Sequence, residues 1–201
     1  IARSQPMSTS LATALPLWIF IALMVATPGP ANMLLMTAGA QQGYIRTLPF
    51  IAGLIVGKLG LNLLMALGLS GFLLENPILK QVFAVIAGTY MAYLALRTWT
   101  PSSGSNNEQR FAFSAGLIVH PLNPKAWVMT TLAVTQFGGD FTTLAERLTI
   151  IPLSFIVIQI FAASFWCSAG VLLNRAFGQN LLLHRGLILL TLAVIVWALT
   201  L

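Results

Sequence analysis

The sequence predicts an all-α integral membrane protein in which six transmembrane helices form two inverted three-helix repeats. Three observations lead to this prediction. Of the 201 residues, 58% are hydrophobic and only 7% are charged, whereas soluble domains carry about 25% charged residues. Six apolar stretches each reach the length of about 20 residues that a membrane-spanning helix needs. Two of them, the first and the fourth, are broken near their midpoints by proline motifs at residues 27–32 and 120–125.

Short segments that carry turn residues or charges separate the six apolar stretches. Gly43 and Pro49 mark the first turn, and Pro77 ends the second. The first and fourth stretches are longer than a straight crossing requires, as expected for tilted or interrupted helices. The expected spans cover residues 12–39, 48–74, 78–99, 111–137, 148–173 and 181–201.

One clearly polar segment, residues 100–110, divides the chain into two parts. We expect it to link a first three-helix repeat at residues 7–99 to a second at residues 111–201. Residues 1–6 do not resemble a natural start, whereas Met7 followed by Ser-Thr-Ser does. We therefore expect residues 1–6 to be an artificial remnant.

The two parts resemble each other in the placement of their prolines. The midpoints of the first and fourth stretches lie near residues 26 and 124, and a proline motif sits at each. The second and fifth stretches each open with a proline, Pro49 and Pro152. An odd number of helices per part inverts the second copy in the membrane, and broken helices at matching positions of inverted repeats are typical of transporters.

The net charge of +6 comes from basic residues scattered over short loops. Such a distribution makes no basic face, which argues against nucleic-acid binding. It instead predicts orientation, because cytoplasmic loops carry an excess of Lys and Arg. We expect the more basic side to be cytoplasmic and both termini to lie outside. That side holds Arg46, Arg97, Arg110, Arg175 and Arg185, and the other holds Lys80, Arg147 and Arg3.

The proline motifs predict a site for a transported substrate. Proline removes a backbone donor and breaks the helix, and a break that faces lipid costs several kcal/mol per stranded polar group. A break is therefore tolerated where it faces protein or a water-filled cavity. The candidate substrate-binding residues of the two motifs are Pro28, Gly29, Pro30, Asn32, Asn123, Pro124 and Lys125.

Lys58 is a further candidate, and Asn62, four residues later, shares its helix face. Lys58 lies about 15 Å into its span at 1.5 Å rise per residue, close to the membrane midplane. A lysine there costs about 2.5–3.5 kcal/mol, so it faces a cavity or a partner more often than it snorkels to the interface. We expect Lys58 to bind a substrate carboxylate or to carry a coupled proton.

The polar residues of the second motif each have a functional and a structural interpretation. Lys125 binds substrate, or it stabilises the C-terminal end of a half-helix. Asn123, like Asn32, binds substrate or bridges helices. His120 carries the coupled proton, or it is a hydrogen-bonded core histidine.

Missing residue types narrow the function. The four acidic residues fall in loops or at span ends, which argues against a cationic substrate and favours an anionic group such as an α-carboxylate. No spacing suits a metal site, and the single Cys167 excludes an intramolecular disulfide and a thiol pair for redox or metal chemistry. Without a Ser/His pair or a carboxylate dyad, we expect no enzyme, no metal and no cofactor. The acidic residues are Glu75, Glu108, Asp140 and Glu146.

A seam of small residues runs along the second stretch. Gly53, Gly57 and Gly60 line one side of it, with Gly68 and Gly71 further along. Glycines spaced by three or four residues let helix backbones approach closely. The seam serves packing within the chain or, alternatively, a dimer interface.

Several segments together resemble the LysE/RhtB family of amino-acid exporters. They are Thr-Pro-Gly-Pro-Ala-Asn at 27–32, the Gly-Tyr-Ile-Arg turn at 43–46, the glycine-rich 52–57, the segment 87–97, and the segment 113–126 that contains His-Pro-Leu-Asn-Pro-Lys. The resemblance covers nearly the whole chain in the same order. It implies a bacterial inner-membrane exporter of amino acids, driven by the proton gradient and assembled as a homodimer.

The sequence departs from that family at two candidate positions. Many members carry an acidic residue near the position of Lys58 and an asparagine where His120 stands. With lysines rather than carboxylates near the breaks, we expect export of a small, neutral amino acid by alternating access around the two broken helices. The alternative from another class is a non-transporting membrane scaffold that binds a partner through its glycine seams.

Overall fold

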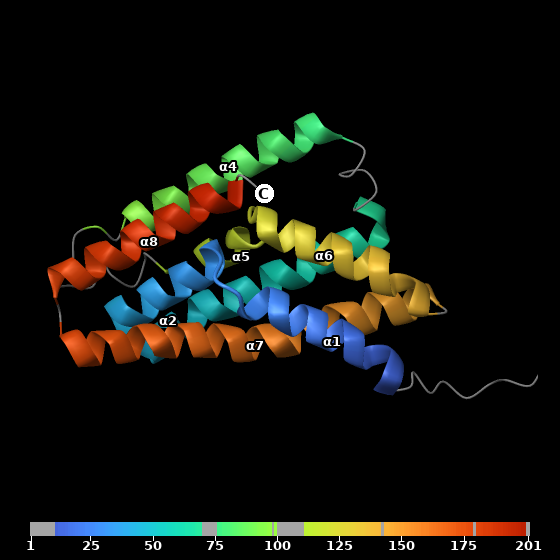
Figure 1. Ribbon diagram of the computed structural model, residues 1–201, viewed down its shortest axis with the longest axis horizontal. Coiled ribbons are helices and arrows are strands. Elements are labelled where there is room, and N and C mark those ends of the chain that lie inside the picture. Colours follow the sequence, from blue (N-terminus) through green and yellow to red (C-terminus); the bar gives the residue numbers. More distant parts are fainter. Residues whose placement is uncertain are drawn as a thin grey trace, which may run out of the picture.

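The computed structural model describes residues 11–69, 76–97, 99, 111–141, 143–178 and 180–199. All regular structure in these ranges is helical, and the helices run along one long axis (Figure 1). The all-α prediction is confirmed. The helices are α1 (Leu11–Ala26), α2 (Pro30–Leu64), α4 (Pro77–Leu96), α5 (Phe113–Val119), α6 (Pro124–Phe137), α7 (Leu144–Phe177) and α8 (Leu181–Leu199), with a π turn η1 (Met65–Leu69) and a 3₁₀ turn η3 (Gly138–Asp140).

Several helices are apolar enough to lie in a membrane. Three segments of the described chain have both the length and the hydropathy of a membrane span: Pro30–Leu69, Leu144–Phe177 and Leu181–Leu199. Two shorter apolar helices, Ala14–Ala26 and Ala84–Leu96, accompany them. These helices are consistent with an integral membrane protein.

The chain leaves the helical conformation at both proline motifs. α1 ends at Ala26, and α2 begins at Pro30 after an extended Gly29 (φ −162°, ψ 168°). α5 ends at Val119, and α6 begins at Pro124. The N–H group of the first residue in a helix has no intrahelical acceptor, so a proline at that position loses no hydrogen bond. Each motif can therefore start its second half-helix at low cost.

α2 consists of two helical segments that run in opposite directions. The reversal lies at Gly43 (φ 80°, ψ 171°), a conformation that a residue with a Cβ rarely adopts. In Figure 1 the blue part of α2 runs to the left end of the molecule, and the cyan part returns from it. The turn predicted between the first two apolar stretches therefore lies at Gly43.

The expectation that Pro49 and Pro152 open their helices is wrong. Pro49 lies inside α2, because the reversal at Gly43 starts the second segment earlier. Pro152 lies inside α7, because Thr143 and Glu146 form a capping box that begins the helix at Leu144. The polar linker 100–110 and the residues 70–75 lie outside the described ranges.

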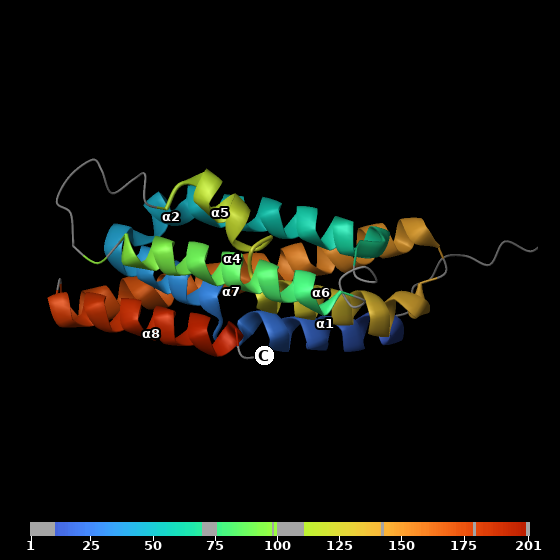
Figure 2. The ribbon, with the colours of Figure 1, turned by 90° about the horizontal axis from the view of Figure 1, so that it is seen from above.

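The two longest helices, α2 and α7, form the centre of the bundle. Seen from above, α8 and α1 lie along one side of the bundle, and α5 with the second segment of α2 lies along the other (Figure 2). α2 packs against both α7 and α8. Buried apolar side chains such as Leu34, Leu54 and Phe155 fill the space between these helices. This packing holds the two breaks near the middle of the length of the bundle.

The glycine seam of α2 serves packing within the chain at two of its positions. A Cβ on Gly57 would overlap the carbonyl oxygen of Leu117 in α5, and one on Gly53 would overlap that of Phe113. Gly60 is exposed and has no such neighbour within 4 Å among the described residues, so it takes no part in this packing, and the dimer alternative for it stays a prediction.

Gly57→Ala is expected to destabilise the fold, because α2 and α5 must move apart to accept the methyl group. Overpacking of this kind costs about 1–3 kcal/mol. Thermal unfolding of the purified protein in detergent should show a melting temperature several degrees lower. Gly60→Ala, on the same helix, is the matched control and should not lower it. Equal melting temperatures for the two variants would contradict the close contact.

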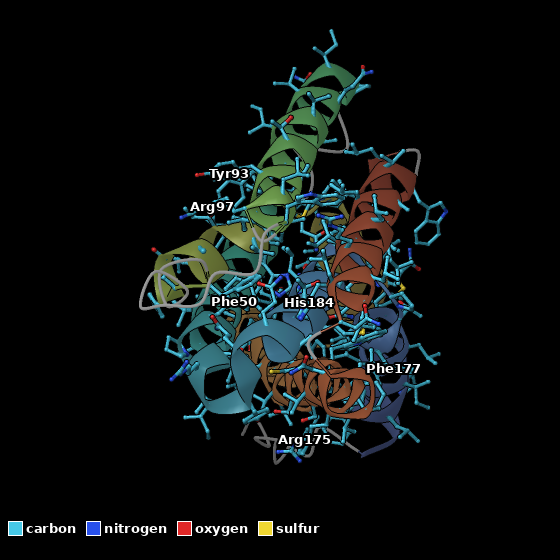
Figure 3. The ribbon with its side chains drawn as sticks, turned by 90° about the vertical axis from the view of Figure 1, so that its left-hand side faces the viewer. Phe50, Tyr93, Arg97, Arg175, Phe177 and His184 are labelled. Carbon is cyan, nitrogen blue, oxygen red and sulfur yellow. The ribbon has the colours of Figure 1, made fainter. Side chains whose placement is uncertain are left out.

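Arginines gather at one end of the molecule, the end that faces the viewer in Figure 3. Arg97 follows α4, and Arg175 closes α7, both at this end (Figure 3). Arg46 follows the reversal at Gly43, and Arg185 lies in the first turns of α8. The described acidic residues, Asp140 and Glu146, lie at the opposite end. That these four arginines share one end agrees with the grouping of basic residues read from the sequence.

Candidate functional site

Lys125 connects the two proline motifs. Its Nζ donates to the carbonyl oxygen of Thr27 at 2.8 Å, to Thr27 Oγ1 at 2.7 Å and to the carbonyl oxygen of Pro28 at 3.3 Å. A cation at the C-terminal end of a helix stabilises the free carbonyls there. The structural interpretation of Lys125 is therefore realised in this conformation, with α1 as the half-helix.

Other side chains complete the carbonyl end of α1. Asn32 Nδ2 donates to the carbonyl oxygens of Val25 at 2.8 Å and Thr27 at 3.0 Å. Trp166 Nε1, from α7, donates to the carbonyl oxygen of Ala26 at 3.2 Å. Buried backbone carbonyls need such partners. Asn32 therefore closes a helix end here.

The half-helices that begin at the breaks differ at their N-termini. In α6 the side chain of Asn123 accepts from the backbone N–H of Lys125 at 3.1 Å. In α2, which Gly29 precedes, no side chain caps the first turn. Helix N-termini carry partial positive charge and unpaired N–H groups. The start of α2 can therefore attract an anionic group.

A cavity of about 500 Å³ lies against both breaks. Small-molecule sites usually enclose about 300–1,000 Å³. Its wall is mostly apolar, and Lys125 is the one charged side chain among the described residues that line it. Gly29, Pro30 and Pro124 contribute from the breaks, while α4 and α8 close the other side with residues that include Trp197.

A second cavity of about 20 Å³ adjoins the first and has a more polar lining. Asn32, His120, Asn123 and Gln159 line it, and it shares Gly29 and Lys125 with the larger cavity. We call this second cavity the polar recess. Both ring nitrogens of His120 and Nε2 of Gln159 are buried without a hydrogen-bond partner in the described part of the chain.

Gln159 was missed at the sequence level. It lies in α7 and is 1% exposed. An amide in the middle of an apolar helix is a signal that could have singled it out, because an unpaired polar group is costly in such a place. Nothing in the sequence places it beside the two proline motifs.

Lys58 lies apart from both cavities. It is fully buried, and its Nζ donates to Thr130 Oγ1 at 2.6 Å and to the carbonyl oxygen of Ala126 at 3.3 Å. The ring centroid of Phe155 lies 4.1 Å from Nζ, a favourable cation–π distance. The snorkelling interpretation is wrong, because Lys58 points into the protein.

Asn62 joins Lys58 through a shared partner. Thr130 Oγ1, which receives the Lys58 bond, lies 3.0 Å from Asn62 Oδ1 and can donate to it. The two side chains therefore share a helix face, as expected. The structure brings together Gly29, Pro30, Asn32, His120, Asn123, Pro124 and Lys125, whereas Lys58 and Asn62 form a separate cluster and the exposed Pro28 contributes its carbonyl oxygen.

Comparison with known proteins identifies the family. Residues 22–201 match the LysE type translocator family. The chain belongs to this family. The cysteine/O-acetylserine efflux protein of Salmonella choleraesuis (strain SC-B67) is 25% identical over 184 residues, which cover 88% of this chain and 93% of the relative. The protein of that name from Escherichia coli (strain K12) is 24% identical over 165 residues, with 81% and 84% covered. No solved structure matches this chain.

Membership of the LysE type translocator family confirms the resemblance seen in the motifs. Members of this family are transporters rather than enzymes. The family and the apolar helices together indicate a protein of the bacterial inner membrane. Both proline motifs lie inside the matched range, and so does every candidate site residue.

Proposed function

We propose that this protein exports small, neutral amino acids or close derivatives of them across the bacterial inner membrane. The cavity of about 500 Å³, with both proline motifs and Lys125 in its wall, carries the proposal. Relatives named cysteine/O-acetylserine efflux proteins support it. Both named compounds are small amino acids whose side chains suit a largely apolar cavity.

The proposed membrane arrangement has six spans in two inverted repeats, at residues 7–99 and 111–201. α1 with the first segment of α2 forms span one, and α5 with α6 forms the equivalent span four. The two pairs run in opposite directions along the bundle (Figure 1), which supports the inversion. By the positive-inside rule the arginine end faces the cytoplasm, and both termini lie outside. The homodimer rests on the family resemblance.

We assign substrate binding to the residues of the two proline motifs that line the larger cavity. Lys125 pairs with the α-carboxylate of the substrate, and the apolar wall receives its side chain. Lys125 already has three acceptors, of which the carbonyl oxygen of Pro28 at 3.3 Å is the most distant. A carboxylate displaces that contact first, because charged acceptors bind an ammonium group more strongly than carbonyls do. Binding therefore loosens the link between the two broken helices, as alternating access requires.

Proton coupling is assigned to Lys58 or His120. Lys58 of α2 is buried against α6 and α7. Alternating access requires these helices to move relative to one another. His120 borders the polar recess next to the substrate cavity. Ionisable groups at membrane depth are typical of proton relays.

Transport of labelled O-acetyl-L-serine and L-cysteine into proteoliposomes tests the proposed function. We expect exchange of label against internal unlabelled substrate, and faster movement when a proton gradient is imposed. A thermal-shift screen against all amino acids identifies the preferred substrate. The scaffold alternative predicts no shift with any amino acid, no exchange, and unchanged stability when Pro28 or Pro124 is replaced.

A further inference from the structure

The polar recess holds more unpaired hydrogen-bonding capacity than a closed protein interior normally keeps. Gln159 and His120 are 1% and 2% exposed, yet Nε2 of the amide and both ring nitrogens have no partner among the described residues. Buried polar groups are nearly always paired, because an unpaired one loses its hydrogen bonds to water and gains none in the protein. The recess can therefore bind a ligand that forms hydrogen bonds with these groups.

The groups around the recess mainly offer N–H donors. Nε2 of Gln159 is a donor, and His120 carries a ring N–H in either neutral tautomer. Ala31 and Asn32, in the uncapped first turn of α2, line the recess as well. Lys125 stands at the boundary with the larger cavity. Donors, a helix N-terminus and an ammonium group together favour an anionic oxygen over a cation.

The size of the recess limits the ligand. A cavity that holds one water molecule needs a volume of about 10–15 Å³, and the recess has a volume of about 20 Å³. It therefore admits one oxygen-sized group but not a whole amino acid. The rest of a larger ligand must remain in the adjoining cavity of about 500 Å³.

We propose that the polar recess binds one oxygen of the substrate's α-carboxylate and that Gln159 is its specificity-determining donor. The second carboxylate oxygen meets Lys125 at the boundary, while the amino group and side chain stay in the larger cavity. His120 is the second donor to the buried oxygen. This subsite rests on the proposed function and adds the requirement for a free carboxylate.

Binding of L-cysteine and L-cysteine methyl ester to the purified protein tests the subsite, because the ester lacks the anionic oxygen. Wild type should bind the free acid more tightly. Gln159→Leu should raise the dissociation constant of the acid about 10- to 100-fold, as expected for the loss of a hydrogen bond to a charged group. The dissociation constant of the ester should stay unchanged.

Stability provides an independent check on this variant. Gln159→Leu replaces an unpaired amide by an apolar side chain, so the ligand-free melting temperature should stay the same or rise. Gln159→Glu, of nearly the same shape, places a carboxylate against the ligand and should weaken acid binding further. Gln136→Leu, at an exposed position of α6, is the matched control and should bind both ligands as wild type does.

The outcomes separate the subsite from the proposed function. An acid-to-ester preference that is as large in Gln159→Leu and in Gln159→Glu as in wild type means that the recess holds a structural water only, and it overturns the subsite while export stands. A wild-type protein that binds neither ligand and exchanges no amino acid overturns the proposed function, and the subsite with it.

Discussion

Replacing Lys125 with alanine is expected to lower the rate of substrate exchange by about 30-fold or more. Truncating one member of a desolvated charge pair costs about 2–5 kcal/mol, and Lys125 is the one charged group among the described residues around the larger cavity. The same change removes the donor to Thr27 and Pro28, so the carbonyl end of α1 loses part of its support. We therefore expect a lower melting temperature as well.

Two further variants separate these roles of Lys125. Lys125→Arg keeps the positive charge but not the compact ammonium, so it should retain part of the exchange activity. Thr27→Val removes one acceptor of Lys125, the hydroxyl, and leaves both backbone carbonyls in place. It should weaken the link between the breaks and leave the carboxylate partner intact. Full exchange by Lys125→Ala in proteoliposomes would show that the carboxylate is held elsewhere.

Replacing Lys58 with methionine is expected to abolish accumulation driven by the proton gradient and to spare exchange. Lys58 does not line either cavity, so its loss leaves the substrate contacts in place. Methionine fills a similar volume without a charge. Because the partners of the buried ammonium group among the described residues, Thr130, Ala126 and Phe155, are all neutral, its removal should not lower the melting temperature.

The comparison of two assays in the same proteoliposomes decides the role of Lys58. Gradient-driven accumulation should disappear, because methionine cannot carry the coupled proton. Exchange at equal pH on both sides should stay near that of wild type. Accumulation equal to wild type would rule out coupling through Lys58. A parallel loss of exchange and accumulation would instead make Lys58 part of substrate binding.

The carbonyl end of α1 is tied to three other elements. Asn32 from α2, Lys125 from α6 and Trp166 from α7 all donate to it. Any movement of α1 against these helices must break or exchange such bonds. In the proposed function, a carboxylate that competes for Lys125 would lower the cost of that movement and would so connect substrate binding to the conformational change of the transport cycle.

The sequence was sufficient for the helical class and for the position of both breaks, because proline acts locally on its own helix. It also identified Lys125 and both interpretations of it. The partners of Lys125 could not be predicted, because Thr27 lies 98 residues away in the chain and only the folded arrangement brings them together. The same limit explains why Gln159 went unnoticed as a neighbour of His120.

Spacing was least informative where residues outside the pattern decide the structure. Gly57 and Gly60 look equivalent in a small-residue seam, yet α5 covers the first and leaves the second open. Pro49 and Pro152 look like helix starts, yet a reversal at Gly43 and a capping box at Thr143 set the true ones. Neither proline begins its helix, because other residues of the same segment determine where the helix starts.

Protection of an introduced cysteine by substrate tests the central claim, that the cavity between the breaks is the substrate site. The single native cysteine, Cys167, is buried and can be replaced by alanine to give a cysteine-free background. Val128→Cys then places a thiol in the wall of the larger cavity, and Val196→Cys places one on an exposed part of α8 outside it. We predict that O-acetyl-L-serine slows maleimide labelling at Val128→Cys and leaves labelling at Val196→Cys unchanged. Equal labelling of Val128→Cys with and without a substrate that the protein exchanges would contradict the account.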